Sequence, residues 1–213
     1  ATWPVYFIGG LYVLGAVLGW LVLLLVLLRC LVEGSQSYNT VPGIAWLWVI
    51  SMLFMEIALL VGHAEWSLGL AATIKSSIGW AKGWALMGLF ILLGSTVRFD
   101  RAMLIRAVTI VCAFAIVFFM VSFVVYFAGG PQVLFVSPLK IVGGPGPEYF
   151  ELRFYGMNPE THKPRWFFFA PWAPAAGLLS CLFLIICLQE TSKRWRTMGV
   201  IGCLLICVFS QSR

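Results

Sequence analysis

Residues 107–127 read AVTIVCAFAIVFFMVSFVVYF, a run of 21 residues without a charged side chain. A helix needs about 20 predominantly apolar residues to cross the hydrocarbon core of a bilayer, so this run predicts a membrane span. Basic residues of the segment 98–106 precede it, and Gly129-Gly130-Pro131 follows it. Because glycine and proline interrupt helices, the span is expected to end near Phe127.

The rest of the chain has the same apolar character. Of its 213 residues, 62% are hydrophobic and 10% are charged, whereas a soluble domain has roughly 45–50% and about 25%. A soluble fold needs a polar surface that this composition does not provide. A soluble enzyme, a disordered protein and a disulfide-rich secreted domain are therefore excluded. We expect an all-α, polytopic transmembrane helix bundle of about six spans with one long extracytoplasmic loop.

Other apolar runs place the remaining spans. Spans one to four occupy residues 1–127, and the more polar segment 63–82 is a possible interfacial or re-entrant helix within them. Residues 128–170 form the long loop, which contains Gly-Pro breaks and many aromatic residues. Residues 171–213 hold spans five and six. The chain begins without Met and ends soon after an apolar run, so we expect it to be a truncated segment of a longer protein.

Charge predicts the orientation of these spans. The net charge is +6, and two basic loops, 98–106 and 189–198, lie an even number of spans apart. The positive-inside rule therefore places both in the cytoplasm and the loop 128–170 outside. Since no basic stripe with interleaved aromatics is present, nucleic acid is not expected as a partner.

The outer loop contains the best candidates for a binding site. Arg153 and Arg165 could bind phosphate oxygens, because the guanidinium group is a bidentate ligand for them. His162 is a weaker candidate for a catalytic base. Arg213 would lie at the same outer rim, at the end of span six. The alternatives are a solvated charged loop and, for Arg213, an interfacial side chain that reaches the lipid headgroups.

Three further features allow a functional and a structural interpretation. Glu56 lies within span two, where an acidic residue is either functional or hydrogen-bonded inside the bundle. The aromatic residues between Trp166 and Trp172 are typical of an interfacial belt, but they could also stack on sugars or line a lipid groove. The six cysteines are interpreted as small apolar residues, because no CxxC motif is present. No metal site and no cofactor are predicted.

The arrangement of spans four to six resembles the O-antigen ligase and polymerase superfamily. The resemblance covers about residues 98–213. It depends on Ser210-Gln211-Ser212-Arg213 at the outer end of a span, on Arg153 with Asn158-Pro159, and on Arg165 followed by prolines. Members of this family are multi-span inner-membrane glycosyltransferases, so the resemblance implies the bacterial inner (plasma) membrane.

The resemblance also implies a reaction. A glycan carried on polyprenyl pyrophosphate is transferred to an acceptor hydroxyl, and arginines stabilise the pyrophosphate that leaves. Arg213, Arg165 and Arg153 are the implied ligands, and the membrane lipid and the lipid-linked glycan are the implied partners. The family's base is expected beyond Arg213. The alternatives are a non-catalytic accessory subunit of a larger membrane complex, packed against other subunits, and a transporter.

Overall fold

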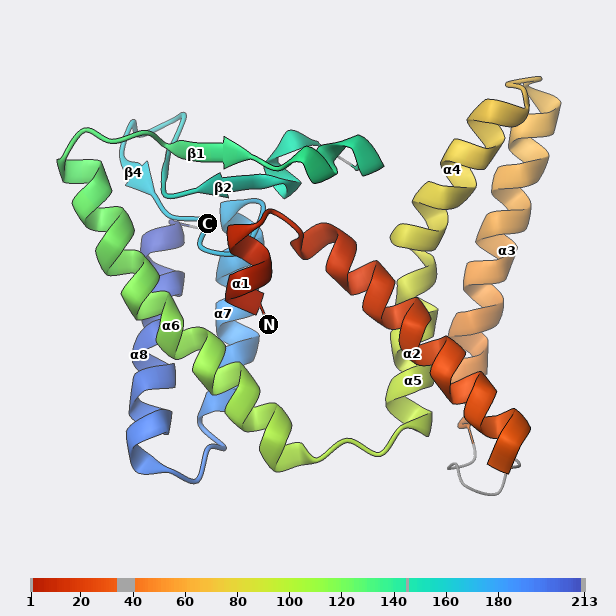
Figure 1. The fold of residues 1–213 in the computed structure, drawn as a ribbon, viewed down its shortest axis with the longest axis horizontal. Helices are drawn as coiled ribbons and strands as arrows, with labels where there is room; N and C mark the ends of the chain where they lie inside the picture. The colour runs from red at the N-terminus through yellow and green to blue at the C-terminus, as the bar shows by residue number, and fades with distance from the viewer. Residues whose placement is uncertain (1, 34–40, 145, 212–213) are drawn as a thin grey trace. The chain divides into compact units, whose positions relative to one another are not determined.

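The computed structural model describes residues 2–33, 41–144 and 146–211 and is mostly helical (Figure 1). Four of the described helical segments are long and apolar enough to cross a membrane: Leu11–Val32, Gly43–Glu65, Leu70–Thr96 and Arg101–Phe127. The chain is therefore a helical protein of the membrane type, as its composition predicts. It divides into two compact units, one of residues 1–12 and 100–213 and the other of residues 13–99.

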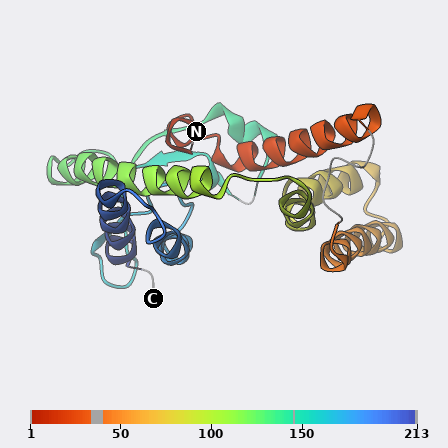
Figure 2. The same ribbon diagram turned by 90° about the horizontal axis from the view of Figure 1, so that it is seen from below.

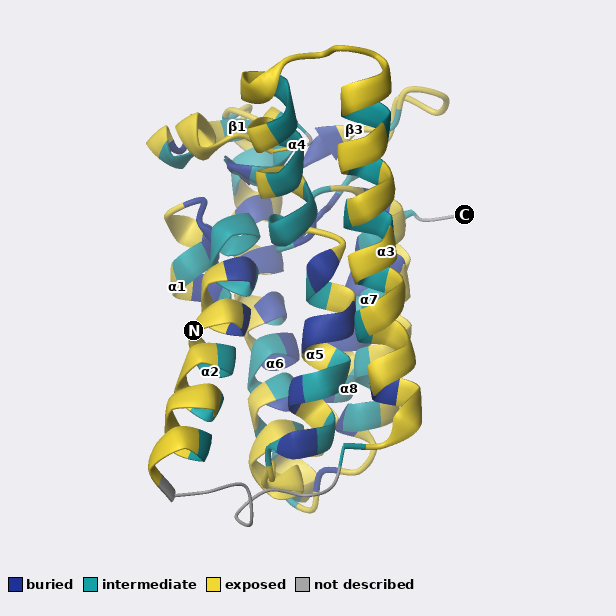
Figure 3. Ribbon diagram, turned by 90° about the vertical axis from the view of Figure 1, so that its right-hand side faces the viewer, coloured by how far each residue is buried: buried dark blue, intermediate teal, exposed yellow. Residues whose placement is uncertain are grey.

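The unit of residues 13–99 is built from four helices. Most of α2 (Leu11–Glu33) belongs to it, together with α3 (Gly43–Glu65), α4 (Leu70–Lys82) and α5 (Ala85–Thr96). Indole N–H groups tie these helices together, since Trp20 donates to Ala81 O at 3.0 Å and Trp80 to Met52 O at 3.0 Å. Only Ala45 of α3 is buried, and Figure 3 shows the rest of this helix as exposed or intermediate.

The polar segment 63–82 joins two of these helices. Its first residues complete α3, and its last thirteen form α4. The pair is linked by a contact of 3.3 Å between Thr73 Oγ1 and His63 Nδ1. A short turn at Gly83 and Trp84 connects α4 to α5, and 70–82 is the first part of the candidate span Leu70–Thr96. An interfacial or re-entrant placement of 63–82 stays a prediction.

Three helices form the body of the other unit. They are α6 (Arg101–Phe127), α7 (Ala173–Cys187) and α8 (Lys193–Ser210), and Figure 2 shows α7 and α8 on the same side of α6. The Asp100 carboxylate caps α6 by accepting hydrogen bonds from the N–H groups of Ala102 and Met103, at 2.8 and 3.4 Å. With 15 residues, α7 extends for about 22 Å, less than the roughly 30 Å hydrocarbon thickness. Six spans therefore stay a prediction.

The two predicted basic loops meet at one end of this unit. Arg106 donates from Nε to Glu190 Oε2 at 2.8 Å and from its guanidinium to Oε1 at 2.8 Å. The Arg101 guanidinium bonds Gln189. Glu190 is buried, with 3% of its surface exposed. Hydrogen bonds from Arg106 and from the backbone of Ser192 lower the pKa of Glu190 to about 2. The two loops thus share one end, and the membrane side they face stays a prediction.

The first predicted span is not continuous. A short helix, α1 (Thr2–Phe7), ends before α2 begins at Leu11. The N–H of Gly10 bonds Val5 O at 2.9 Å and the N–H of Gly9 bonds Tyr6 O at 2.8 Å, which is the Schellman pattern of a helix end. Gly9 has φ of +66°, and a Cβ there would lie 2.6 Å from Phe150 O. The apolar run at the start of the chain is therefore not one continuous helix, because this glycine turn ends α1.

The segment 128–170 is an ordered cap of short strands and 3₁₀ turns. Strand β1 (Val133–Val136) pairs antiparallel with β2 (Glu151–Arg153), and β3 (Gly156–Met157) pairs antiparallel with β4 (Pro164–Arg165). The turns η2 (Pro138–Val142) and η3 (Pro147–Tyr149) lie between β1 and β2. The fold therefore departs from purely helical structure in the segment where glycine and proline are concentrated.

The main hydrophobic core lies under this cap. Phe118 and Phe119 of α6 pack there with Trp3 of α1 and with Trp166 and Phe168 of the cap. Trp166 and Phe168 are 3% and 0% exposed. The predicted interfacial aromatic belt is therefore wrong for these two side chains, because they fill the space between the cap and the helix ends. Trp172 is exposed, as a belt residue would be.

Candidate functional site

The cap is held to the helix ends by hydrogen bonds from distant parts of the chain. The backbone N–H of Trp166 donates to Phe209 O at 3.0 Å, and Gln211 Nε2 donates to Pro164 O at 2.9 Å. The Tyr155 hydroxyl donates to Gly130 O at 2.8 Å. The end of α8 therefore lies beside β4, and the residues of β4 have a fixed place relative to the bundle.

Two of the predicted arginines converge on one aromatic ring. The Arg153 Cζ lies 5.2 Å from the centroid of the Phe167 ring, and the Arg165 Cζ lies 5.1 Å from it. Guanidinium groups at this distance from an aromatic face are attracted by its quadrupole. A Cβ on Gly156 would lie 2.5 Å from the Phe167 ring, so a larger residue at position 156 would clash with this ring. The arginines come from different strands, β2 and β4, and share Phe167 as their support.

The two arginines differ in their hydrogen bonding. The Arg153 guanidinium pairs with the Glu151 carboxylate, two residues before it on β2. The Nε of Arg165 is buried and has no hydrogen-bond partner among the described residues. A buried donor without a partner costs roughly 1–3 kcal/mol, so an anion that accepts from it would be stabilised by that amount. Arg165 is thus the arginine with unused binding capacity.

The other predicted site residues lie in three different situations. Arg213 lies outside the described residues, as does Ser212. His162 lies exposed at the tip of the turn between β3 and β4, with φ of +52°. Its backbone N–H donates to Asn158 O at 2.9 Å. The structure therefore brings together Arg153 and Arg165 but shows no contact of the His162 side chain with them.

Glu56 belongs to the unit of residues 13–99 and lies in α3. Its Oε2 is buried without a hydrogen-bond partner among the described residues. The structural interpretation of Glu56 is a carboxyl group that is hydrogen-bonded inside the bundle. Its Oε2 atom does not make such a bond with the described residues. Glu56 is a separate feature from the arginine pair.

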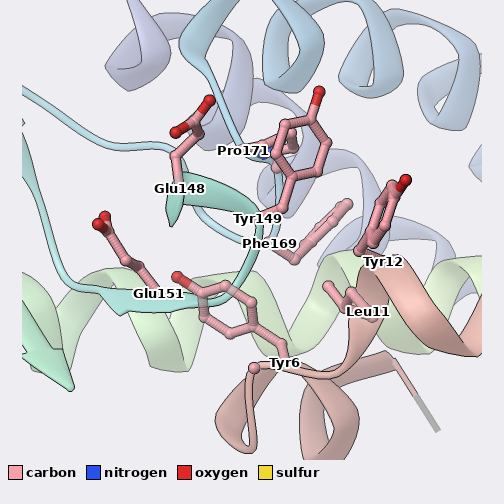
Figure 4. Close-up of a pocket in the computed structure, with 10 residues that line it drawn as sticks. Tyr6, Leu11, Tyr12, Glu148, Tyr149, Glu151, Phe169 and Pro171 are labelled. Carbon is pink, nitrogen blue, oxygen red and sulfur yellow. The ribbon is translucent and has the colours of Figure 1, made fainter. Parts of the chain in front are cut away.

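A cavity of about 220 Å³ has Glu151, the carboxylate partner of Arg153, among its lining residues. Aromatic and acidic side chains dominate its lining, as Figure 4 shows: Tyr6, Tyr12, Tyr149, Phe169, Glu148 and Glu151. Glu148 and Glu151 lie on the left of that view and Tyr12 on the right. Since Glu151 is also the partner of Arg153, the cavity and the arginine pair are connected.

Tyr6 fixes the wall between the cavity and β2. Its hydroxyl donates to Arg153 O at 2.8 Å and accepts from the Arg153 N–H at 3.3 Å. Burial raises the pKa of Tyr6 above its usual value. Burial, followed by the charge of Glu148, also raises the pKa of Tyr149. Both phenols are therefore neutral hydrogen-bonding groups near pH 7.

An apolar groove of about 650 Å³ adjoins the cavity. It is lined by residues of α1, α6 and α7, among them Trp3, Phe7, Phe114 and Phe183. Phe169 lines both the groove and the cavity. The site thus combines an apolar groove, an aromatic and acidic cavity, and a guanidinium pair, each joined to the next by a shared side chain or an ion pair. Such an order suits a ligand with a lipid tail and a polar, anionic head.

The sequence analysis did not place the cavity or the groove. It gave a lipid groove only as an alternative role for the aromatic residues between Trp166 and Trp172, one of which, Phe169, lines both. Their residues come from positions 2–12, 107–114 and 148–183, which no local motif connects. The one signal available was the clustering of Tyr and Glu at 148–151, next to Arg153. No protein-family model matches the chain, and neither a curated protein nor a solved structure matches it significantly.

Proposed function

We propose that this chain forms part of an integral-membrane glycosyltransferase of the O-antigen ligase and polymerase type. The enzyme transfers or polymerises a glycan carried on polyprenyl pyrophosphate, at the outer face of the bacterial inner membrane. The observation that supports this most is the convergence of Arg153 and Arg165 on Phe167, beside a cavity that a sugar could occupy.

The chemistry requires a stabilised leaving group. An acceptor hydroxyl attacks the anomeric carbon, the bond from that carbon to the pyrophosphate oxygen breaks, and polyprenyl pyrophosphate leaves. In the proposed site, Arg165 binds the pyrophosphate because its buried Nε–H is unpaired. Fixed donors of this kind stabilise the charge that develops in the transition state. Arg213 is proposed as a further ligand, from the resemblance alone.

The cavity and the groove have complementary roles in this proposal. Aromatic faces and carboxylates of Tyr6, Tyr149 and Glu148 suit the apolar faces and hydroxyl groups of a sugar ring. The groove beyond Phe169 suits the polyprenyl chain, since its lining is almost entirely apolar. His162 stays a weak candidate for the catalytic base, because its side chain is exposed at the turn between β3 and β4.

The test is substitution of Arg165 in the full-length protein in its host membrane. We expect Arg165→Ala to reduce glycan transfer at least about 100-fold, because removal of one transition-state donor typically costs 10²–10³ in rate. Arg165→Lys should restore only part of it, since Lys lacks the planar fork. Lys163→Ala, at an exposed position two residues away, is the matched control and should keep normal transfer.

Membrane abundance and thermal stability of each variant separate loss of function from loss of folding. Normal transfer by a stably folded Arg165→Ala protein would contradict the proposed site. Loss of transfer in the Lys163→Ala control would mean that the turn between β3 and β4, rather than the Arg165 guanidinium, determines the result.

A non-catalytic accessory subunit is the second candidate function. It is favoured by α3, which has one buried residue and carries a carboxyl oxygen, Glu56 Oε2, that has no hydrogen-bond partner among the described residues. A polar group in hydrocarbon is expected to pair with a neighbouring helix. If that helix belongs to another subunit, a photo-crosslinker at Ile57 should trap it stoichiometrically, and Glu56→Leu should reduce co-purification. A protein that purifies alone and retains glycan transfer would exclude this role.

A further inference from the structure

Three buried cysteines meet in the core of the unit formed by residues 1–12 and 100–213. Cys112 comes from α6, Cys187 is the last residue of α7, and Cys203 lies in α8. Their exposures are 0%, 0% and 1%. The three Sγ atoms all lie within 4.8 Å of one another, and those of Cys187 and Cys203 are 3.9 Å apart. The sequence shows no such cluster, because the residues are 91 positions apart at most.

Close packing of α6, α7 and α8 fixes the positions of the three cysteines. A Cβ on Gly202 would lie 1.9 Å from the backbone oxygen of Cys112, so α6 and α8 are in direct main-chain contact there. A Cβ on Gly199 would lie 3.0 Å from Cys187 Sγ. The two glycines of α8 thus bring the helices close enough for the thiols to meet. The sulfur positions are set by helix packing and not by a flexible loop.

The spacing of the sulfur atoms matches that of a metal–thiolate site. A metal–sulfur bond of about 2.3 Å gives sulfur–sulfur distances of roughly 4.0 Å in a trigonal arrangement and about 3.8 Å in a tetrahedral one. The observed 3.9 Å between Cys187 and Cys203 agrees with both, and side-chain rotation could bring Cys112 to the same distance. A disulfide would instead need about 2.05 Å.

We propose that Cys112, Cys187 and Cys203 bind one monovalent copper ion. Soft thiolate ligands select Cu(I), Zn²⁺ or iron–sulfur clusters, but structural Zn²⁺ requires four ligands. The group of candidate ligands found among the described residues contains three members. Three sulfur ligands, with no His, Asp or Glu in the group, suit Cu(I), which is stable in trigonal coordination. Each thiol that binds releases its proton to solvent, and the oxidation state of the metal does not change.

The end of the unit that holds the Arg106–Glu190 pair also holds a cavity. A cavity of about 400 Å³ at this end of the unit is lined by Asp100, Arg106, Gln189 and Glu190, among others. Cys187 lies only two residues before Gln189, and Thr109 lies between Arg106 and Cys112 on one face of α6. An ion that enters this cavity has about one to two helical turns to cross.

The test uses the full-length protein, purified under reducing conditions and titrated with Cu(I) against a colorimetric Cu(I) chelator. We expect one Cu(I) per chain, and at least a tenfold weaker affinity for Cys112→Ser and Cys203→Ser. Cys181→Ser and Cys207→Ser are matched controls, because they change exposed cysteines on the same two helices, α7 and α8. These two variants should bind as the unchanged protein does.

X-ray absorption on the unchanged, copper-loaded protein gives a second measurement that needs no variant. Three sulfur neighbours in the first coordination shell are expected. In the titration, three results would overturn the proposal: Zn²⁺ is retained in place of Cu(I), no copper is retained against the chelator, or the control variants lose as much Cu(I) affinity as Cys112→Ser and Cys203→Ser. In the absorption spectrum, a first coordination shell of oxygen or nitrogen would overturn it. The readout does not involve glycan transfer, so it is independent of the proposed function.

Discussion

The hydroxyl of Tyr6 connects α1 to a strand almost 150 positions away. It satisfies both the carbonyl and the N–H of Arg153, while its ring packs into the core against Phe118. A single side chain thus replaces the neighbour that an edge strand would otherwise need. Tyr6 also lines the 220 Å³ cavity next to Glu151. Its position therefore affects both the stability of the cap and the shape of the site.

Removal of this hydroxyl should destabilise the protein measurably. Tyr6→Phe leaves the backbone groups of Arg153 without their partner, and we expect the free energy of unfolding to fall by about 1–3 kcal/mol. Thermal denaturation in detergent measures this change. Tyr126→Phe is the control, because that ring packs against Tyr155 and Trp166 and its hydroxyl makes no hydrogen bond within the described part of the chain. Equal stability of the two variants would refute the role given to Tyr6.

The pair of Arg106 and Glu190 should make stability depend on pH. The pKa of Glu190 is lowered to about 2 from 4.5, mainly by Arg106. A carboxyl group with a lowered pKa in the folded state stabilises it above its unfolded pKa, and that contribution is lost as the pH falls toward the folded pKa. The stability difference between the unchanged protein and Glu190→Gln should therefore be constant above about pH 5 and shrink between pH 4.5 and 2.

Melting temperatures measured in detergent across this pH range test the assignment. In an Arg106→Gln background, Glu190→Gln should produce a much smaller difference, because the main cause of the pKa shift is gone. A difference that is the same at pH 6 and at pH 3 in the unchanged background would show that the pair does not form.

At this scale, residue types predicted part of the site. Arg153 and Arg165 were selected because guanidinium groups bind phosphate, and the structure places them at one ring. The sequence could not predict that Glu151 pairs with Arg153, nor that Arg165 keeps a free Nε–H. Both facts depend on how β2 and β4 are placed within the cap, and no local pattern encodes that.

Among the elements, the crossing of α6 and α8 is the closest helix contact described. Its geometry depends on Gly202, where a Cβ would lie 1.9 Å from a backbone oxygen of α6. Main-chain atoms cannot move aside as a flexible side chain can. Small residues allow the same close approach at helix interfaces in membranes.

Gly202→Ala should therefore separate the two helices. We expect a loss of about 3 kcal/mol or more, at the upper end of what overpacking costs, seen as a lower melting temperature and a loosened cap. Gly62→Ala in α3 is the control, because a Cβ there has no atom within 4 Å. That change should alter stability by no more than about 1 kcal/mol. A fully stable Gly202→Ala protein would exclude this packing.

Hydropathy predicted the long helices well and the interruptions poorly. The apolar runs at 43–62 and 107–127 lie within α3 and α6. The break after α1 was missed, because it depends on one glycine with positive φ inside an apolar run. The Gly-Pro breaks in 128–170 indicated a long loop there. Its strands, with only two to four residues each, are too short for a periodic pattern.

For the molecule as a whole, composition predicted the membrane character and the structure adds where the candidate features lie. Arg153, Arg165, the cavity and the cysteine cluster all belong to the unit of residues 1–12 and 100–213. Glu56 belongs to the other unit. This division could not be predicted, because α1 joins its unit across almost 90 intervening residues.

The arrangement of this unit predicts a membrane topology that can be measured. The loop containing Thr191 lies at the end of the Arg106–Glu190 pair, and Glu160 lies in the cap at the other end of α6. A membrane-impermeant thiol reagent should label Glu160→Cys in intact spheroplasts and Thr191→Cys only after permeabilisation. The unchanged protein gives the background from native cysteines. Labelling of both positions from the outside would contradict the predicted orientation.

The hydrogen bonds from Trp166 to Phe209 and from Gln211 to Pro164 have a consequence for biosynthesis. The cap emerges from the ribosome about 45 residues before its partners on α8, so it cannot close when it is first made. Until α8 is inserted, Trp166 and Phe168 lack part of the surface that covers them. A ribosome that stalls after the cap and before α8 would leave an intermediate with exposed aromatic side chains at the translocon. Quality-control proteases should recognise the protein at that stage.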